Sequence, residues 1–166
     1  TMKERWYLQT KKADFNEISR KFNISPILAR LIRNRDVVGD ENIRNYLSAN
    51  IERLSSPWLF KDMDRAVDIL KIKIAAGNKI RIICDYDVDG VCSGYILYRS
   101  LKNLGAVVDV VVPHRIEDGY GINENLIKKA FDQGIDTILT CDNGIAAYNQ
   151  VEYAKSLGMT IIVTDH

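Results

Sequence analysis

Acidic residues gather at a few places in this sequence, and each of these places follows an apolar run. The group consists of five aspartates and one histidine: Asp85, Asp87, Asp89, Asp142, Asp165 and His166. Carboxylates that share a cleft repel one another unless they share protons or bind cations. Carboxylates with one imidazole favour divalent ions such as Mg²⁺ or Mn²⁺, and two such ions about 4 Å apart commonly hydrolyse phosphate esters. The residue types therefore predict a two-metal phosphoesterase.

Two other classes of protein use aspartates in a similar pattern. In a haloacid-dehalogenase-type phosphatase, Asp87 would be a covalent nucleophile and Asp89 its acid. That reading leaves Asp142 and His166 without clear roles. In a receiver-like phosphorylation switch, which is not an enzyme, Asp142 would carry the phosphate. Binding of a dinucleotide is disfavoured, because the turn after the first strand carries three carboxylates where that fold needs glycines.

A parallel sheet is the scaffold that would bring these residues together. Runs rich in β-branched residues alternate with helical patterns from Lys79 onward. The runs occupy 80–84, 107–112, 137–141 and 160–164, and the helical patterns occupy 91–104, 123–133 and 146–157. Near-continuous apolar strands between helices predict an α/β fold with a doubly wound, mainly parallel sheet. The carboxyl ends of its strands meet at one edge, where ligands bind.

The first 78 residues have helical periodicity. Ser25-Pro26 is typical of a helix start, Asp40 is expected to cap a second helix, and a longer helix is expected over about 60–76. We therefore predict a helical N-terminal segment, 1–78, that packs on a catalytic α/β domain, 79–166. The sequence stops directly after the fourth strand, so we expect this domain to be truncated at its C-terminal end.

Composition and charge narrow the range of partners. Apolar residues make up 46% of the 166 residues, yet no apolar run approaches the roughly 18 residues of a membrane span. We expect a soluble, cytoplasmic protein without membrane contact. Residues 1–80 hold 16 Lys and Arg against 10 Asp and Glu, whereas residues 81–166 hold 7 against 12. The basic half could bind along a polyanion such as a nucleic acid, although solvated helix faces are the more common explanation of such a charge pattern.

Three cysteines show no zinc-binding spacing. They are Cys84, Cys92 and Cys141, an odd number without a CxxC pair, and we expect free thiols in a reducing compartment.

Four motifs, in order and spacing, resemble the DHH phosphoesterase superfamily. They are DYDVDG at 85–90, PHRIEDGYG at 113–121, DNGI at 142–145 and VTDH at 163–166. Within that superfamily the sequence is most similar to the RecJ family of single-strand-specific 5′-to-3′ exonucleases, and the resemblance covers nearly the whole chain. It implies hydrolysis of single-stranded DNA in DNA repair and recombination, with other repair proteins as further partners. Hydrolysis of short oligonucleotides or cyclic dinucleotides is the alternative within the superfamily.

The resemblance also implies a role for each site residue. Two divalent ions, Mn²⁺ or Mg²⁺, would be held by four ligands: Asp87, Asp89, Asp142 and His166. Asp142 would bridge the ions, and the catalytic-motif residues Asp85 and Asp165 would orient the ligands. Arg115 and Tyr120 would bind substrate, the first by gripping phosphate and the second by stacking on a base.

Two features depart from the family pattern. Cys84 stands where the family usually has glycine, and the sequence ends before the second histidine of the DHH triplet and before the C-terminal domain. We therefore expect this stretch by itself to be a poor enzyme.

Overall fold

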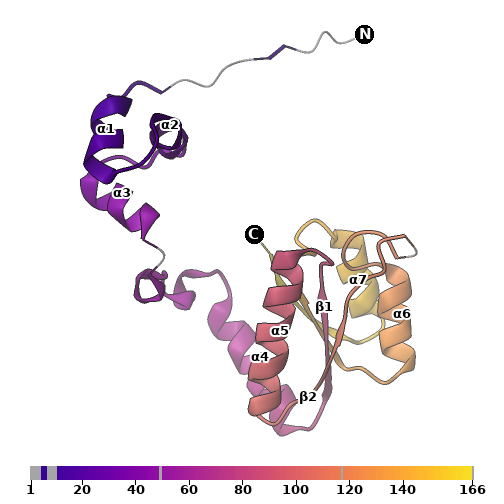
Figure 1. Ribbon diagram of the computed structural model, residues 1–166. Helices are drawn as coiled ribbons and strands as arrows, with labels where there is room; N and C mark the ends of the chain where they lie inside the picture. Colours follow the sequence, from indigo (N-terminus) through magenta and orange to yellow (C-terminus); the bar gives the residue numbers. More distant parts are fainter. Residues whose placement is uncertain (1–4, 7–10, 49, 117, 166) are drawn as a thin grey trace. The chain divides into compact units, whose positions relative to one another are not determined.

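The chain forms two compact units that divide between Pro57 and Trp58 (Figure 1). The structure is a computed structural model, and it describes residues 5–6, 11–48, 50–116 and 118–165. The sequence pattern placed its boundary at 78, whereas the second unit begins at 58 and includes the helix before the first strand.

The first unit is a small group of helices. Its elements are α1 (Phe15–Phe22), α2 (Pro26–Asn34), α3 (Asp40–Leu47) and the short 3₁₀ turns η1 (Ile51–Arg53) and η2 (Pro57–Leu59), the last of which crosses the boundary. Ser25 caps α2 by accepting a hydrogen bond from the amide of Leu28, as predicted. The prediction for α3 was one residue wrong: Gly39, at φ 85°, is the N-cap, and Asp40 lies in the first turn. A carboxylate there still interacts favourably with the helix dipole.

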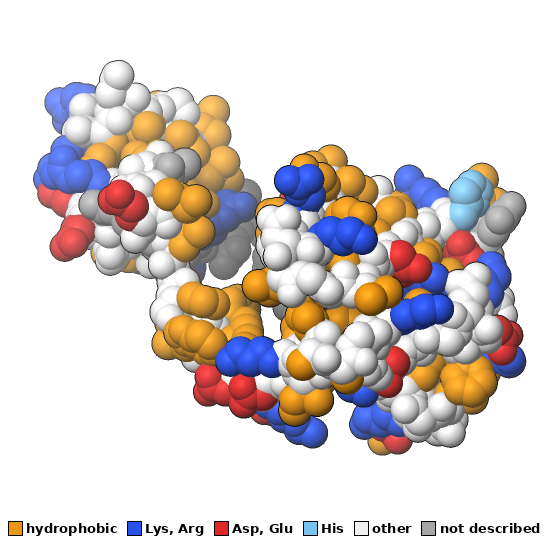
Figure 2. All heavy atoms as spheres, turned by 90° about the horizontal axis from the view of Figure 1, so that it is seen from below, with side chains coloured by type: hydrophobic (Ala, Val, Ile, Leu, Met, Phe, Trp, Pro, Cys, Tyr) orange, Lys and Arg blue, Asp and Glu red, His pale blue; other side chains and the backbone are white. Residues whose placement is uncertain are grey.

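Few apolar side chains are buried among the described residues of the first unit. Ala29, Ile32 and Ile43 are buried, whereas Ile27 and Leu31 are exposed. Hydrophobic side chains are accordingly visible on the surface of this unit in Figure 2.

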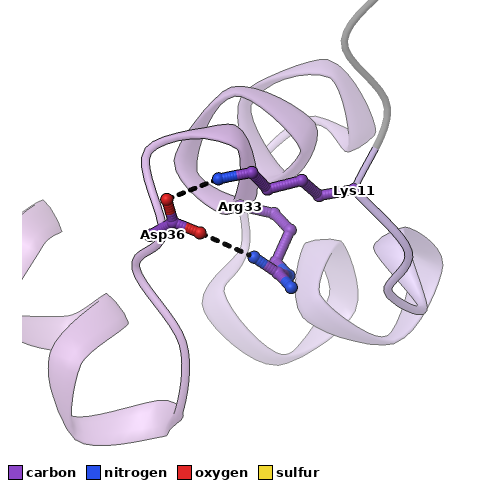
Figure 3. Close-up of polar contacts among 3 residues, drawn as sticks. All are labelled: Lys11, Arg33 and Asp36. Atoms are coloured by element: carbon purple, nitrogen blue, oxygen red, sulfur yellow. Dashed lines mark hydrogen bonds and ion pairs between the residues drawn. The ribbon is translucent and has the colours of Figure 1, made fainter.

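A three-residue ion network closes the turn after α2 (Figure 3). The carboxylate of Asp36 accepts a hydrogen bond from Lys11 and lies 3.5 Å from a guanidinium nitrogen of Arg33. The hydrogen bond and charge of Lys11 hold the pKa of Asp36 below its usual value, with a smaller contribution from Arg33. The network therefore stabilises the unit above the unfolded pKa, and this contribution is lost as the pH falls through the lowered pKa.

The second unit contains a four-stranded parallel sheet, which confirms the predicted α/β fold. Its strands are β1 (Lys79–Cys84), β2 (Val107–Val111), β3 (Thr137–Cys141) and β4 (Thr160–Thr164). Their order is β2-β1-β3-β4, and every neighbouring pair is parallel. The chain leaves β1 toward one edge and β3 toward the other, so the winding direction reverses between these two central strands.

Helices cover both faces of the sheet, as expected for a doubly wound fold (Figure 1). The helices are α4 (Met63–Ala75), α5 (Val88–Asn103), α6 (Glu124–Asp132) and α7 (Tyr148–Ser156). On one face α4 and α5 pack on the core cluster that includes Ile80 and Ile82, and on the other α6 and α7 pack around Ile83 and Ile138. None of the described helices is long and apolar enough to cross a membrane.

Helix α5 begins earlier than the sequence pattern predicted. The expected start was residue 91, but Asp87 is the N-cap and Val88 the first helical residue. Asp87 therefore caps the helix and Asp89 lies in its first turn, whereas Asp85 precedes the helix.

Candidate metal centre

Two aspartates follow the central strands at the point where the winding reverses. Asp85 comes directly after β1 and Asp142 directly after β3, and these strands are paired to their last residues, Cys84 and Cys141. The amide of Asp85 also donates a hydrogen bond to the carbonyl of Cys141. In an open parallel sheet, this reversal point at the carboxyl ends is where ligands bind.

The third aspartate is placed by the start of α5. One oxygen of Asp87 accepts a hydrogen bond from the amide of Gly90 at 2.9 Å, which caps the helix. Gly90 allows a close approach of helix and strand, since a Cβ at this position would lie 2.5 Å from the carbonyl oxygen of Asp85. The positive end of the helix dipole therefore lies near the carboxylates and offsets part of their repulsion.

Asp85, Asp87 and Asp142 form a compact acidic group. Each offers an oxygen, and these oxygens lie within 4.8 Å of one another. Two unit charges 4 Å apart repel by about 4 kcal/mol at the effective dielectric constant of a protein site. Asp85 is only 3% exposed, and its Oδ1 is buried without a hydrogen-bond partner among the described residues. A buried, unsatisfied carboxylate oxygen beside two further carboxylates fits a divalent cation ligand set.

Side-chain hydrogen bonds hold the loops that carry this group. Asn143 is buried, and its amide nitrogen donates to the carbonyls of Ile83 and Cys141, at 3.0 and 2.9 Å, so it ties the ends of β1 and β3 together. Asp142 has φ 62°, a left-handed conformation that aspartate tolerates better than most residues. Sequence reasoning gave Asn143 no role, although its place directly after a strand-end aspartate was a usable signal.

An aromatic and cationic rim borders the acidic group. Tyr120 is 65% exposed, but its hydroxyl donates to the carbonyl oxygen of Asp142 at 3.3 Å. Its ring meets the ring of Tyr86 edge to face at 6.3 Å, and the guanidinium of Arg115 lies 5.3 Å from the centre of the Tyr86 ring. Sequence reasoning missed Tyr86, which links the two predicted substrate-binding residues.

The acidic group also affects the pKa of the Tyr120 hydroxyl. Partial burial, followed by the negative charges of nearby aspartates, raises the pKa of Tyr120 above its usual value. In order of effect these aspartates are Asp85, Asp165, Asp142 and Asp87. The hydroxyl therefore stays protonated at neutral pH and remains a donor.

Two predicted residues lie outside the compact group, and a third is not described by the structure. Asp89 is exposed in the first turn of α5 and is not one of the three clustered carboxylates. Asp165 accepts a hydrogen bond from the amide of Ile145 at 2.9 Å and so holds the loop after β3. His166 lies outside the described residues.

Fold and site together define an α/β protein with a carboxylate group suited to divalent cations at its winding reversal. Residues 79–166 match the family model described as "DHH family, N-terminal domain", and the chain belongs to this family. The match separates the chain from the dehalogenase and receiver classes, which the aspartates alone had left open.

Comparison with known proteins confirms the resemblance to RecJ. The single-stranded-DNA-specific exonuclease RecJ of Bacillus subtilis is 35% identical over 165 residues, which is 99% of this chain and 21% of the relative. The same-named protein of Escherichia coli is 34% identical over 145 residues, 86% of this chain and 24% of the relative. A crystal structure of exonuclease RecJ bound to manganese matches with a TM-score of 0.60 and 36% identity, covering 64% of this chain and 27% of that one. The chain thus spans about a fifth to a quarter of the curated relatives.

Replacement of Gly90 by alanine is expected to disrupt the site. The added Cβ would meet backbone atoms of Asp85. Backbone atoms cannot move aside as the end of a flexible side chain can. We expect a loss of about 1–3 kcal/mol in the free energy of unfolding, typical of overpacking. Urea unfolding would measure it, with Ser100→Ala on the exposed side of α5 as the control. A Gly90→Ala protein as stable as the control would contradict this close packing.

Neutralising Asp87 should separate the repulsion among the carboxylates from their binding of a divalent ion. The asparagine side chain in Asp87→Asn keeps the helix cap but removes one charge, so the variant without divalent ions should be at least as stable as the wild type. Millimolar Mn²⁺ should raise the Tm of the wild type more than that of the variant, since an ion at a hundred times its Kd stabilises by about 2.7 kcal/mol.

The control for this comparison is Asp132→Asn, at the end of α6 and close to the amino end of β3. It should respond to Mn²⁺ like the wild type. An equal Mn²⁺ response in Asp87→Asn would show that the acidic group does not hold the ion.

Proposed function

We propose that the protein containing this chain hydrolyses phosphodiester bonds with divalent metal ions, as a 5′-to-3′ exonuclease on single-stranded DNA. The observation that carries the proposal is the group of three carboxylates within 4.8 Å at the winding reversal, one of them buried with an unsatisfied oxygen. The names of the RecJ relatives support the choice of single-stranded DNA as substrate.

Two divalent ions, Mn²⁺ or Mg²⁺, are the proposed cofactors. Asp85, Asp87 and Asp142 would hold them, and the resemblance adds Asp89 and His166 as further ligands. Bound divalent ions supply Lewis acidity to the phosphoryl group and make water a nucleophile near neutral pH. The chain's own contribution is to hold the carboxylates close together, through the α5 cap at Asp87 and the Asn143 hydrogen bonds.

The rim beside the acidic group is proposed to receive the substrate. Arg115 is exposed and would form charge-assisted hydrogen bonds to phosphate, and Tyr120 offers an exposed ring for stacking on a base. Tyr86 sets the relative position of both side chains by contacting each of them. A phosphate entering between this rim and three carboxylates would be repelled without cations, which is a further reason to expect metal dependence.

The biological setting follows from the same resemblance. We propose a role in DNA repair and recombination in the cytoplasm, with other repair proteins as partners of the full-length form.

Substitutions in the full-length protein test this function. Asp142→Asn keeps a residue that tolerates φ 62° but removes a charge from the acidic group, so cleavage of single-stranded DNA should fall by several orders of magnitude. Arg115→Ala should cost less, about 1.5–3 kcal/mol for one charged hydrogen bond. Release of mononucleotides from 5′-labelled single strands, with Mn²⁺ or Mg²⁺, measures both.

Arg99→Ala, an exposed arginine on α5, is the matched control for Arg115→Ala and should cleave like the wild type. Strong cleavage by Asp142→Asn, or equal cleavage of duplex and single strands, would contradict the proposal. A preference for dinucleotides over long strands would keep the chemistry and move the substrate to short oligonucleotides.

A further inference from the structure

Two cysteines lie side by side at the base of the acidic group. Cys84 and Cys141 are the last residues of β1 and β3 and are aligned partners across these neighbouring strands. Each is followed directly by a carboxylate of the group, Asp85 or Asp142. Both thiols are buried, with 1% and 2% of each residue exposed. Any change at this pair therefore acts on the backbone that carries two of the three carboxylates.

The two sulfur atoms point to the same face of the sheet. Both face Gly94 of α5: a Cβ at Gly94 would lie 2.9 Å from Sγ of Cys84 and 3.8 Å from Sγ of Cys141. Sγ of Cys84 donates to the carbonyl oxygen of Val111 at 3.8 Å, and Sγ of Cys141 donates to that of Gly90 at 4.0 Å. Neighbouring strands lie about 4.8 Å apart, within the range of about 4.4–6.8 Å that disulfides span between Cα atoms. The pair can therefore become a disulfide without exchanging strands or helices.

Cys84 also borders a cavity. It lines an apolar cavity of about 410 Å³ between α5 and β2, together with Val91, Tyr95, Tyr98 and Val112. A small, uncharged oxidant can enter such a cavity, whereas a charged one is disfavoured there. Cys92, by contrast, is exposed on α5 and has no cysteine beside it in the described part of the chain.

We propose that Cys84 and Cys141 form a reversible dithiol–disulfide site for hydroperoxides that regulates the metal centre. One thiol of the pair attacks a peroxide oxygen, the O–O bond breaks, and the products are a sulfenic acid and water or an alcohol. The other thiol then attacks that sulfur, an S–S bond forms, and the sulfenic oxygen leaves as water. The two thiols lose two electrons, and these electrons reduce the O–O bond.

The disulfide would alter the acidic group by moving the strand ends. Disulfides most often have their Cα atoms about 5.5–6 Å apart, which exceeds the spacing of about 4.8 Å between neighbouring strands, so an S–S bond here favours a wider separation of the ends of β1 and β3. Asp85 and Asp142 follow these ends directly and move with them. This regulatory step rests on the proposed metal function, whereas formation of the disulfide does not.

Peptide mapping of the full-length protein tests the disulfide itself. After treatment with hydrogen peroxide and blocking of remaining thiols, an endoproteinase that cuts before aspartate releases Cys84 in residues 68–84 and Cys141 in residues 136–141, separate from Cys92. We expect these two peptides to be linked, and dithiothreitol to release them. Peptides that stay unlinked, or that link through Cys92, would overturn the proposal.

Mn²⁺ binding tests the regulation. We expect the oxidised wild type to bind Mn²⁺ about tenfold to a hundredfold more weakly, the range seen when supporting groups of a metal site are lost. Dithiothreitol should restore binding, Cys84→Ala should be insensitive to peroxide, and Cys92→Ser should behave like the wild type.

The two readouts separate the two proposals. A linked pair with unchanged Mn²⁺ binding would overturn the regulation and leave the metal site intact. If the reduced protein fails to bind Mn²⁺, the proposed function fails, while the peptide map still decides whether the disulfide site exists.

Discussion

Electrostatic repulsion among three carboxylates is the constraint on which the rest of the site depends. Asp85, Asp87 and Asp142 lie within 4.8 Å of one another, and Asp85 has little contact with water. A parallel sheet allows this because adjacent strands deliver the ends of β1 and β3 to one place. The N-terminus of α5 and the small size of Gly90 bring compensating backbone dipoles close. The remaining negative charge is what a divalent cation would neutralise.

The same constraint shapes the surroundings of the group. Polar side chains that could compete for the carboxylates are engaged elsewhere: the Asn143 amide bonds to strand-end carbonyls, and Tyr120 donates to a backbone oxygen. Arg115 lies against the Tyr86 ring. A cationic and aromatic rim outside a carboxylate cluster separates the tasks of holding metal and holding a phosphate chain. This division is consistent with the chain's membership of the DHH family.

Local patterns predicted the fold well and the site in part. Apolar runs located all four strands to within a residue, because a buried parallel strand needs a continuous apolar stretch. The start of α5 was missed because Asp87-Val88-Asp89-Gly90 has the composition of a loop, and only the capping bond shows otherwise. Strand order, and with it the closeness of Asp85 to Asp142, depends on crossovers that no local pattern encodes. Tyr86 acts through contacts with residues distant in sequence, so it carried no signal of its own.

Anomalous X-ray diffraction at the manganese absorption edge tests the central claim most directly. Crystals of the full-length protein grown with Mn²⁺ should show anomalous density in contact with the carboxylates of Asp85, Asp87 and Asp142. The same crystals of Asp142→Asn should show weaker density or none at this place. Manganese bound elsewhere in the wild type, with no density among these three carboxylates, would contradict the account.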